Sequence, residues 1–213
     1  MADTLFYTPR SGNSFKPALV LRQTGRACDL RPIDVLGGEN RTPEFLRINP
    51  RGQVPYLVLG DGRGLGESNA IAWYLAEGSW LMPADPLARA QAIQWMIFEQ
   101  TSLEPNISPA RFFTHIAPQL RGEHTADLPR WLEQGNRALR LLDDFLRQRP
   151  FITDHGYSVA DIAVFGYTHL AADGGFDLRR YPAVLDWMGR VRAKPGYADV
   201  DTLLQPCPDR TAP

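Results

Sequence analysis

The pattern of the chain changes near residue 80, and this change limits the fold more than any other feature. Before it, short apolar runs typical of strands (residues 5–7, 28–35 and 56–59) alternate with segments of helical pattern. After it, no strand pattern occurs, and apolar residues recur at helical spacing through the rest of the chain. Because strands that alternate with helices predict a sheet covered by helices, we expect one α/β part and one all-α part.

The order of elements in the first part is β-α-β-α-β-β-α, which predicts a mixed sheet with helices on its faces. We expect this domain to span residues 1–80 and a turn-rich linker to span residues 81–86. An α-helical bundle domain should then occupy residues 87–213. Its most apolar helix, residues 158–171, should be central, because a helix that is apolar on all sides is buried.

Composition and charge exclude several classes of protein. The net charge is −1, so we expect neither nucleic acid nor an anionic membrane as a partner. The first residues lack the pattern of a secretory signal, and no apolar stretch is long enough to span a bilayer, so we expect a cytoplasmic protein. The two cysteines, Cys28 and Cys207, form no metal-binding motif, so neither a metal nor a disulfide framework is expected.

Two neighbouring segments, residues 49–57 and 66–71, suggest a binding site. In the first, a strand begins at Val54-Pro55, and in the second, a helix begins at Glu67-Ser68 after a glycine-rich hairpin. A strand edge can pair with the main chain of an extended peptide, and a helix start can bind a carboxylate. We expect this unit to hold a small peptide that carries a carboxylate.

Four motifs in this order resemble the cytosolic glutathione S-transferases, and the resemblance covers nearly the whole chain. They are residues 38–44, residues 49–57, Glu67-Ser68 and the segment from Ser158 to Asp161. The resemblance implies a thioredoxin-like first domain, glutathione as cosubstrate without a metal, a small electrophile as second substrate, and a homodimer. The last motif has the form of a capping box, a folding device whose loss should cost about 1–2 kcal/mol.

The resemblance assigns most of the glutathione contacts. Val54 should bind the cysteinyl part through its main chain, with a cis bond to Pro55, although a proline at a strand start is the commoner reading of this pair. Ser68 should cap its helix and receive the γ-glutamyl carboxylate, Glu67 should bind the ammonium, and Gln53 should add a further contact.

Asn40 and Arg41 precede a second helix start, at Thr42-Pro43. In the family, this position holds the glycyl carboxylate, and the guanidinium of Arg41 suits that role. The alternative is that both residues are solvated loop residues, since a surface arginine is common.

The catalytic group should lie between the first strand and the first helix, and Ser11 is the first candidate. The glutathione thiolate is the nucleophile, and lowering a thiol pKa by about two units requires about 2.7 kcal/mol. One hydroxyl donor can supply most of this free energy. Asn13 is the alternative donor, Ser14 should cap the helix over residues 15–25, and Tyr7 is either a packing residue or a phenolic donor.

The electrophile pocket is harder to assign. Phe112 and His115 are candidates to line it, although aromatic residues in such a helix are more often part of the core. The leading interpretation is a glutathione transferase. Two alternatives stay open, a glutathione-dependent disulfide reductase without a catalytic cysteine, and a non-catalytic member of the fold that binds a ligand or a partner.

Overall fold

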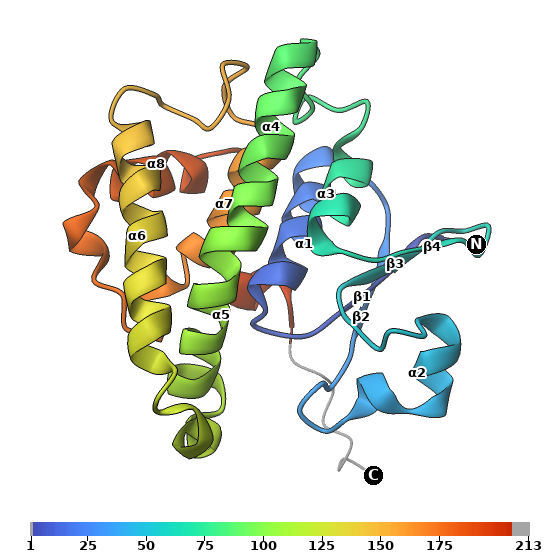
Figure 1. Cartoon of the computed structure of the whole chain (residues 1–213). Helices are drawn as coiled ribbons and strands as arrows, with labels where there is room; N and C mark the ends of the chain where they lie inside the picture. Colours follow the sequence, from blue (N-terminus) through green and yellow to red (C-terminus); the bar gives the residue numbers. More distant parts are fainter. Residues whose placement is uncertain (1, 206–213) are drawn as a thin grey trace. The chain divides into compact units, whose positions relative to one another are not determined.

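The computed structural model describes residues 2–205, which fold into two compact units. Unit 1 consists of residues 2–79 together with residues 195–205, and unit 2 consists of residues 80–194. Unit 1 contains the strands, and unit 2 is built from helices (Figure 1). The expected combination of an α/β part and an all-α part is confirmed.

Unit 1 is organised around a four-stranded mixed sheet. Its strands are β1 (Thr4–Tyr7), β2 (Asp29–Pro32), β3 (Tyr56–Val58) and β4 (Gly64–Leu65). Their spatial order is β2-β1-β3-β4. β1 runs parallel to β2 and antiparallel to β3, which pairs with β4 in the predicted hairpin.

Helices cover both faces of this sheet. The helices of unit 1 are α1 (Gly12–Thr24), the 3-10 turn η1 (Glu39–Arg41), α2 (Pro43–Ile48), α3 (Ser68–Ala76) and α9 (Val200–Leu203). Successive strand residues face opposite sides, so Phe6 packs edge-on against Phe45 of α2 while the fully buried Leu5 faces the other side. On that side α1 and α3 pack together, and Figure 1 shows the strands between them and α2.

The C-terminal segment of the described chain, residues 195–205, belongs to unit 1, whereas the sequence pattern groups it with the helical part. α9 packs on α1, and the Tyr7 hydroxyl donates to the carbonyl of Gln205 at 3.0 Å. Leu203 and Leu204 are buried, and this burial explains why so short a helix is held in place. Cys207 lies outside the described residues.

Unit 2 contains five α-helices among its described residues, and one of them forms its centre. They are α4 (Pro86–Phe98), α5 (Glu104–Arg111), α6 (Leu128–Leu146), α7 (Val159–Thr168) and α8 (Pro182–Arg192). Every residue of α7 is buried, as its apolar sequence predicts, and α7 contacts α4, α5 and α8. No helix in the described part of the chain is both long and apolar enough to cross a membrane.

The region from α4 to residue 116 continues as a helix past its prolines. Two π-helical turns, η2 (Glu99–Leu103) and η3 (Phe112–Ile116), lie on either side of α5. A π turn shifts the hydrogen bonding by one residue, so the missing N–H of Pro105, the second residue after η2, is tolerated. The 3-10 turns η4 (Pro118–His124), η5 (Ala171–Gly174) and η6 (Leu178–Arg180) complete unit 2.

The predicted start of α1 was wrong. The helix begins at Gly12, and its N-cap is Ser11, whose hydroxyl accepts from the Ser14 amide at 3.2 Å. Ser14 is buried inside the helix, where its hydroxyl accepts from the Thr8 amide at 3.2 Å. Pro17 consequently lies inside the helix and not in its first turn.

The capping box at the start of α7 is present, and its aspartate also makes hydrogen bonds outside α7. Ser158 accepts from the Ala160 amide, and the Asp161 carboxylate accepts from the Ser158 amide at 2.9 Å. The same carboxylate also accepts from the Trp187 indole at 2.8 Å and from the Ile152 amide at 3.0 Å. Asp161 is fully buried. Its hydrogen bonds join the start of α7 to α8 and to the segment that contains Ile152.

Candidate functional site

The start of α1 presents a hydroxyl that can act as a hydrogen-bond donor. Ser11 is half-buried, and its capping bond uses one lone pair of the oxygen. A hydroxyl also has one hydrogen to donate, so the same side chain can cap the helix and stabilise an anion. The residue before it, Arg10, has a φ of +60°, a conformation that is uncommon for non-glycine residues and is enriched at functional sites.

The start of α3 is arranged differently from the prediction. Ser68 is the first helical residue and not the N-cap, because the N-cap position belongs to Glu67. Glu67 makes no side-chain capping bond and has a φ of +64°. The first-turn amides of α3 are therefore not capped by that side chain, and such amides can bind a carboxylate.

A buried hydrogen-bond network joins the two helix starts. The Ser68 hydroxyl donates to Oδ1 of Asn13 at 3.1 Å. The Lys16 ammonium donates to the same Asn13 oxygen at 3.1 Å and to Ser68 Oγ at 3.4 Å. Ser68 is 5% exposed and Lys16 is not exposed at all. The candidate residues of α1 and α3 thus lie in direct contact.

The turn before β3 is held by Asn49, and the Val54–Pro55 peptide bond is cis, as the resemblance implies. The Asn49 amide donates to the carbonyl of Gln53 at 2.7 Å, and its oxygen accepts from the Arg51 amide at 3.2 Å. Pro55 is buried, Val54 is half-buried, and the side chain of Gln53 is exposed. This turn therefore leaves Gln53 accessible to a ligand.

Asn40 and Arg41 also contact this turn. The Asn40 amide is 8% exposed and donates to the carbonyl of Gly52 at 2.7 Å. The Arg41 guanidinium is exposed and donates to the carbonyl of Arg51 at 3.2 Å. Asn40 thus supports the turn from within, and Arg41 keeps a guanidinium at the surface, as a carboxylate contact requires.

Charged groups surround this part of unit 1. Arg51 forms an ion pair with Glu67 at 2.8 Å, in which both side chains are more than half exposed. A surface pair of this kind is worth little, so a ligand ammonium can compete with Arg51 for Glu67. Within residues 2–205, no group of three or more His, Cys, Asp or Glu side chains is arranged to hold a metal ion.

Two other groups of unit 1 are poor candidates for catalysis, the Tyr7 hydroxyl as a donor to a thiolate and the Cys28 thiol as a nucleophile. The Tyr7 hydroxyl donates its proton to the Gln205 carbonyl, which favours the packing role over the phenolic donor. Burial raises the pKa of the Cys28 thiol to about 11, outweighing a hydrogen bond with Leu5 that favours the thiolate. Because the thiolate is the reactive form, Cys28 is a poor nucleophile near neutral pH.

The two predicted pocket residues, Phe112 and His115, lie on η3 in unit 2. Phe112 is half-buried, and its ring contacts Phe113 edge-on, with a centroid distance of 5.0 Å. His115 Nε2 lies 3.8 Å from the carboxylate of Asp173, which is bound at 3.0 Å by the buried Arg111. Both residues therefore take part in contacts within unit 2.

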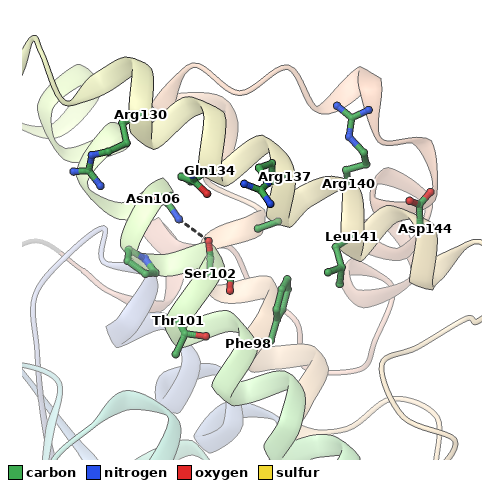
Figure 2. A pocket seen from close by; sticks show the side chains of 12 residues that line it. Phe98, Thr101, Ser102, Asn106, Arg130, Gln134, Arg137, Arg140, Leu141 and Asp144 are labelled. Carbon is green, nitrogen blue, oxygen red and sulfur yellow. Dashed lines mark hydrogen bonds between the residues drawn. The ribbon is translucent and has the colours of Figure 1, made fainter.

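Unit 2 also contains an open cleft of about 830 Å³ between η2 and α6 (Figure 2). Figure 2 shows Arg130, Gln134 and Arg137 of α6 facing the side from which Thr101 and Ser102 project. Neither Phe112 nor His115 lines it. The complete lining is Phe98, Thr101, Ser102, Pro105, Asn106, Arg130, Gln134, Arg137, Ala138, Arg140, Leu141 and Asp144.

Sequence reasoning missed Lys16, Arg51 and the support given by Asn49. Lys16 had a visible signal, because it interrupts the apolar run from Phe15 to Leu21 in a chain that contains only two lysines. A charge in the buried stripe of a helix indicates a specific partner. The pairing of Arg51 with Glu67 had no such signal, because it depends on how the turn before β3 approaches α3.

Comparison with known proteins identifies the family of the chain. Residues 10–77 match the family model described as the N-terminal domain of glutathione S-transferase. The disulfide-bond oxidoreductase YfcG of Escherichia coli is 31% identical over 198 residues, which cover 90% of each chain. The match therefore extends over both units.

Solved structures show the same relationship. A possible glutathione S-transferase from Rhodopseudomonas palustris has 44% identity and a TM-score of 0.90, with 93% of this chain and 90% of that chain covered. A glutathione transferase from Pseudomonas putida, solved with one glutathione disulfide per subunit, has 25% identity and a TM-score of 0.82. The match covers 96% of this chain and 91% of that one.

Proposed function

Because the chain belongs to the glutathione S-transferase superfamily, we propose that it binds glutathione in unit 1 and transfers it to a small, partly apolar electrophile. In this proposal Ser11 donates a hydrogen bond to the glutathione thiolate. The γ-glutamyl carboxylate binds at the start of α3 beside Ser68, and Glu67 binds the ammonium. Val54 and Gln53 contact the cysteinyl part, and Arg41 binds the glycyl carboxylate.

One observation carries this proposal, the contact between the starts of α1 and α3. The hydrogen bond from Ser68 to Asn13, 3.1 Å long, joins the two helix starts. This contact supports the proposal that a thiolate donor and a carboxylate site lie on adjacent helix ends. Each helix N-terminus carries a partial positive charge that favours an anion. A ligand with a thiolate and a nearby carboxylate, such as glutathione, matches both ends at once.

The chemistry needs no base stronger than the groups present. The thiolate sulfur forms a bond to the electrophilic carbon, and the leaving group departs with the electron pair of the bond that breaks. The thiol proton passes to solvent when glutathione ionises. The protein contributes donors that favour the thiolate, and binding that holds the sulfur in place.

A second candidate function is glutathione-dependent disulfide reduction, which the resemblance to YfcG favours. The glutathione thiolate would attack a mixed disulfide of glutathione with another thiol, giving glutathione disulfide and releasing that thiol. The high pKa of Cys28 is consistent with this scheme, because glutathione itself then supplies the nucleophile.

A titration followed by two assays tests these functions. We expect glutathione to bind with a Kd in the micromolar to low millimolar range, measured by isothermal titration calorimetry. Turnover with a chromogenic aryl halide supports the transferase, and turnover of a glutathione mixed disulfide alone supports the reductase. No heat of binding at millimolar glutathione would contradict both and leave the non-catalytic interpretation.

We also infer a homodimer, which the family resemblance implies. Helix α4 exposes three large apolar side chains, those of Leu87, Ile93 and Ile97, with 66%, 46% and 57% of their surface accessible. Ile93 and Ile97 are four residues apart and so lie on one face of the helix, and adjacent exposed apolar groups can mark an interface. Sedimentation velocity should give a mass of about twice 23.9 kDa, and Ile97→Glu should shift the protein toward the monomer. A monomer at all accessible concentrations would contradict this expectation.

A further inference from the structure

Lys16 is a component of unit 1 that the proposed function does not use. It is completely buried, although lysine is almost never fully buried unless it is paired. The chain has only two lysines, Lys16 and Lys194, among 23 basic residues. A chain that uses arginine nearly everywhere else therefore uses lysine at the contact between α1 and α3.

The contacts of Lys16 determine how two candidate site residues are oriented. An ammonium can only donate hydrogen bonds, so the oxygen of the Asn13 amide has to face it, and the amide NH₂ has to point the other way. Ser68 Oγ likewise has to offer a lone pair to Lys16, which leaves its hydrogen for the Asn13 oxygen. One buried side chain thus sets the direction of both groups.

The geometry points to Lys16 as a positioning residue of the glutathione site. Through Ser68 it holds the first turn of α3, and through Asn13 it ties that turn to the start of α1. The N-cap residue of α3, Glu67, makes no side-chain capping bond, whereas the Ser68 hydroxyl ties this first turn to Asn13 and Lys16. We therefore expect Lys16 to determine how tightly the γ-glutamyl carboxylate binds. This inference rests on the proposed function.

Two ligands that differ only in that carboxylate provide the test. S-methylglutathione cannot form a thiolate, so any contribution of Asn13 or Ser11 to thiol ionisation is absent. The second ligand is S-methylglutathione in which a γ-aminobutyryl group replaces the γ-glutamyl residue, so it lacks only the α-carboxylate. Lys16→Met should weaken the binding of S-methylglutathione about tenfold, or by about 1.4 kcal/mol. It should weaken the binding of the analogue by less than about twofold. Isothermal titration calorimetry measures both values.

Lys194→Met is the matched control, because that lysine lies in unit 2 over the ring of Phe151. It should leave both affinities unchanged. A merely structural role of Lys16 would weaken both ligands equally, and that result, or no loss at all, overturns the inference. If wild-type protein binds neither ligand, the proposed glutathione site itself is wrong, which is a different outcome.

Asn13→Ala keeps the inference testable if Lys16→Met does not fold. This variant removes the shared acceptor and keeps the lysine. The ratio of the affinity for S-methylglutathione to that for the analogue should then fall by a similar factor, about tenfold. A preference equal to that of the wild type would show that the network does not position the carboxylate site. Thermal melting of each variant shows whether it is folded before its affinities are compared.

Discussion

Asp161→Ala should lower the free energy of unfolding by about 4 kcal/mol, the largest stability effect that we expect for a single substitution here. The change leaves the Trp187 indole and the Ile152 and Ser158 amides without their buried acceptor. Each unsatisfied donor costs about 1–3 kcal/mol. Urea unfolding followed by circular dichroism measures the loss.

Ser158→Ala is the matched control for this prediction. It removes the cap on α7 and the hydroxyl that donates to Asp161 at 3.3 Å, but it keeps the Asp161 acceptor for Trp187 and Ile152, so it should cost about 1 kcal/mol. The sequence predicted similar losses of about 1–2 kcal/mol for the two substitutions, and the additional contacts of Asp161 separate them. Equal losses would mean that the bonds to Trp187 and Ile152 contribute nothing.

The same carboxyl group should make stability depend on pH. Burial raises the pKa of Asp161 to about 6. The hydrogen bonds that the carboxylate accepts, first among them that from Trp187, lower the pKa and offset part of this rise. In the unfolded chain an aspartate titrates near pH 3.9, so between about pH 4 and pH 6 the folded state holds the extra proton. Stability contributed by this group therefore falls as the pH rises through that window. Asp161→Asn should remove this part of the pH dependence, which urea unfolding at several pH values measures.

Ser11→Ala should raise the thiol pKa of bound glutathione by about one to two units, because the thiolate loses a donor worth about 1.5–3 kcal/mol. At neutral pH the value of kcat/KM for a chromogenic electrophile should fall about 10- to 100-fold. The ultraviolet absorbance of the thiolate, followed as a function of pH in the binary complex, gives the pKa directly.

Two further substitutions separate the donor role of Ser11 from its role as the N-cap of α1. Ser11→Asp keeps the cap and removes the donor, so the protein should stay folded and lose activity. Ser11→Thr keeps both roles and should retain most of the activity. If Ser11→Ala leaves the bound thiol pKa unchanged, Ser11 is not the stabilising group, and Asn13 becomes the candidate.

The sequence predicted the fold well because its signals are local. Runs such as Leu5 to Tyr7, the glycine-rich hairpin before Ser68 and the apolar α7 determine elements with little help from distant residues. Helix starts were less predictable. Ser11 and Ser14 are both good capping residues, and the choice between them depends on the bond from the Thr8 amide to Ser14.

The candidate site was predictable where a motif defines it, and less so where contacts between segments define it. Ser68 is recognisable as a helix-start residue, but its hydroxyl turns inward because Asn13 and Lys16, more than fifty residues earlier, lie beside it. Asn40 stays a predicted ligand contact, and its hydrogen bond to the Gly52 carbonyl was not predictable from the motif. Such assignments require knowledge of which loops meet.

The return of residues 195–205 to unit 1 has a consequence for synthesis on the ribosome. Unit 1 is discontinuous, because residues 80–194 are made between its two parts. At about 5–20 residues per second, those residues take about 6–23 s to translate. During that interval the surface of α1 that α9 later covers stays exposed in the nascent chain. Unit 1 begins to form first and is completed last.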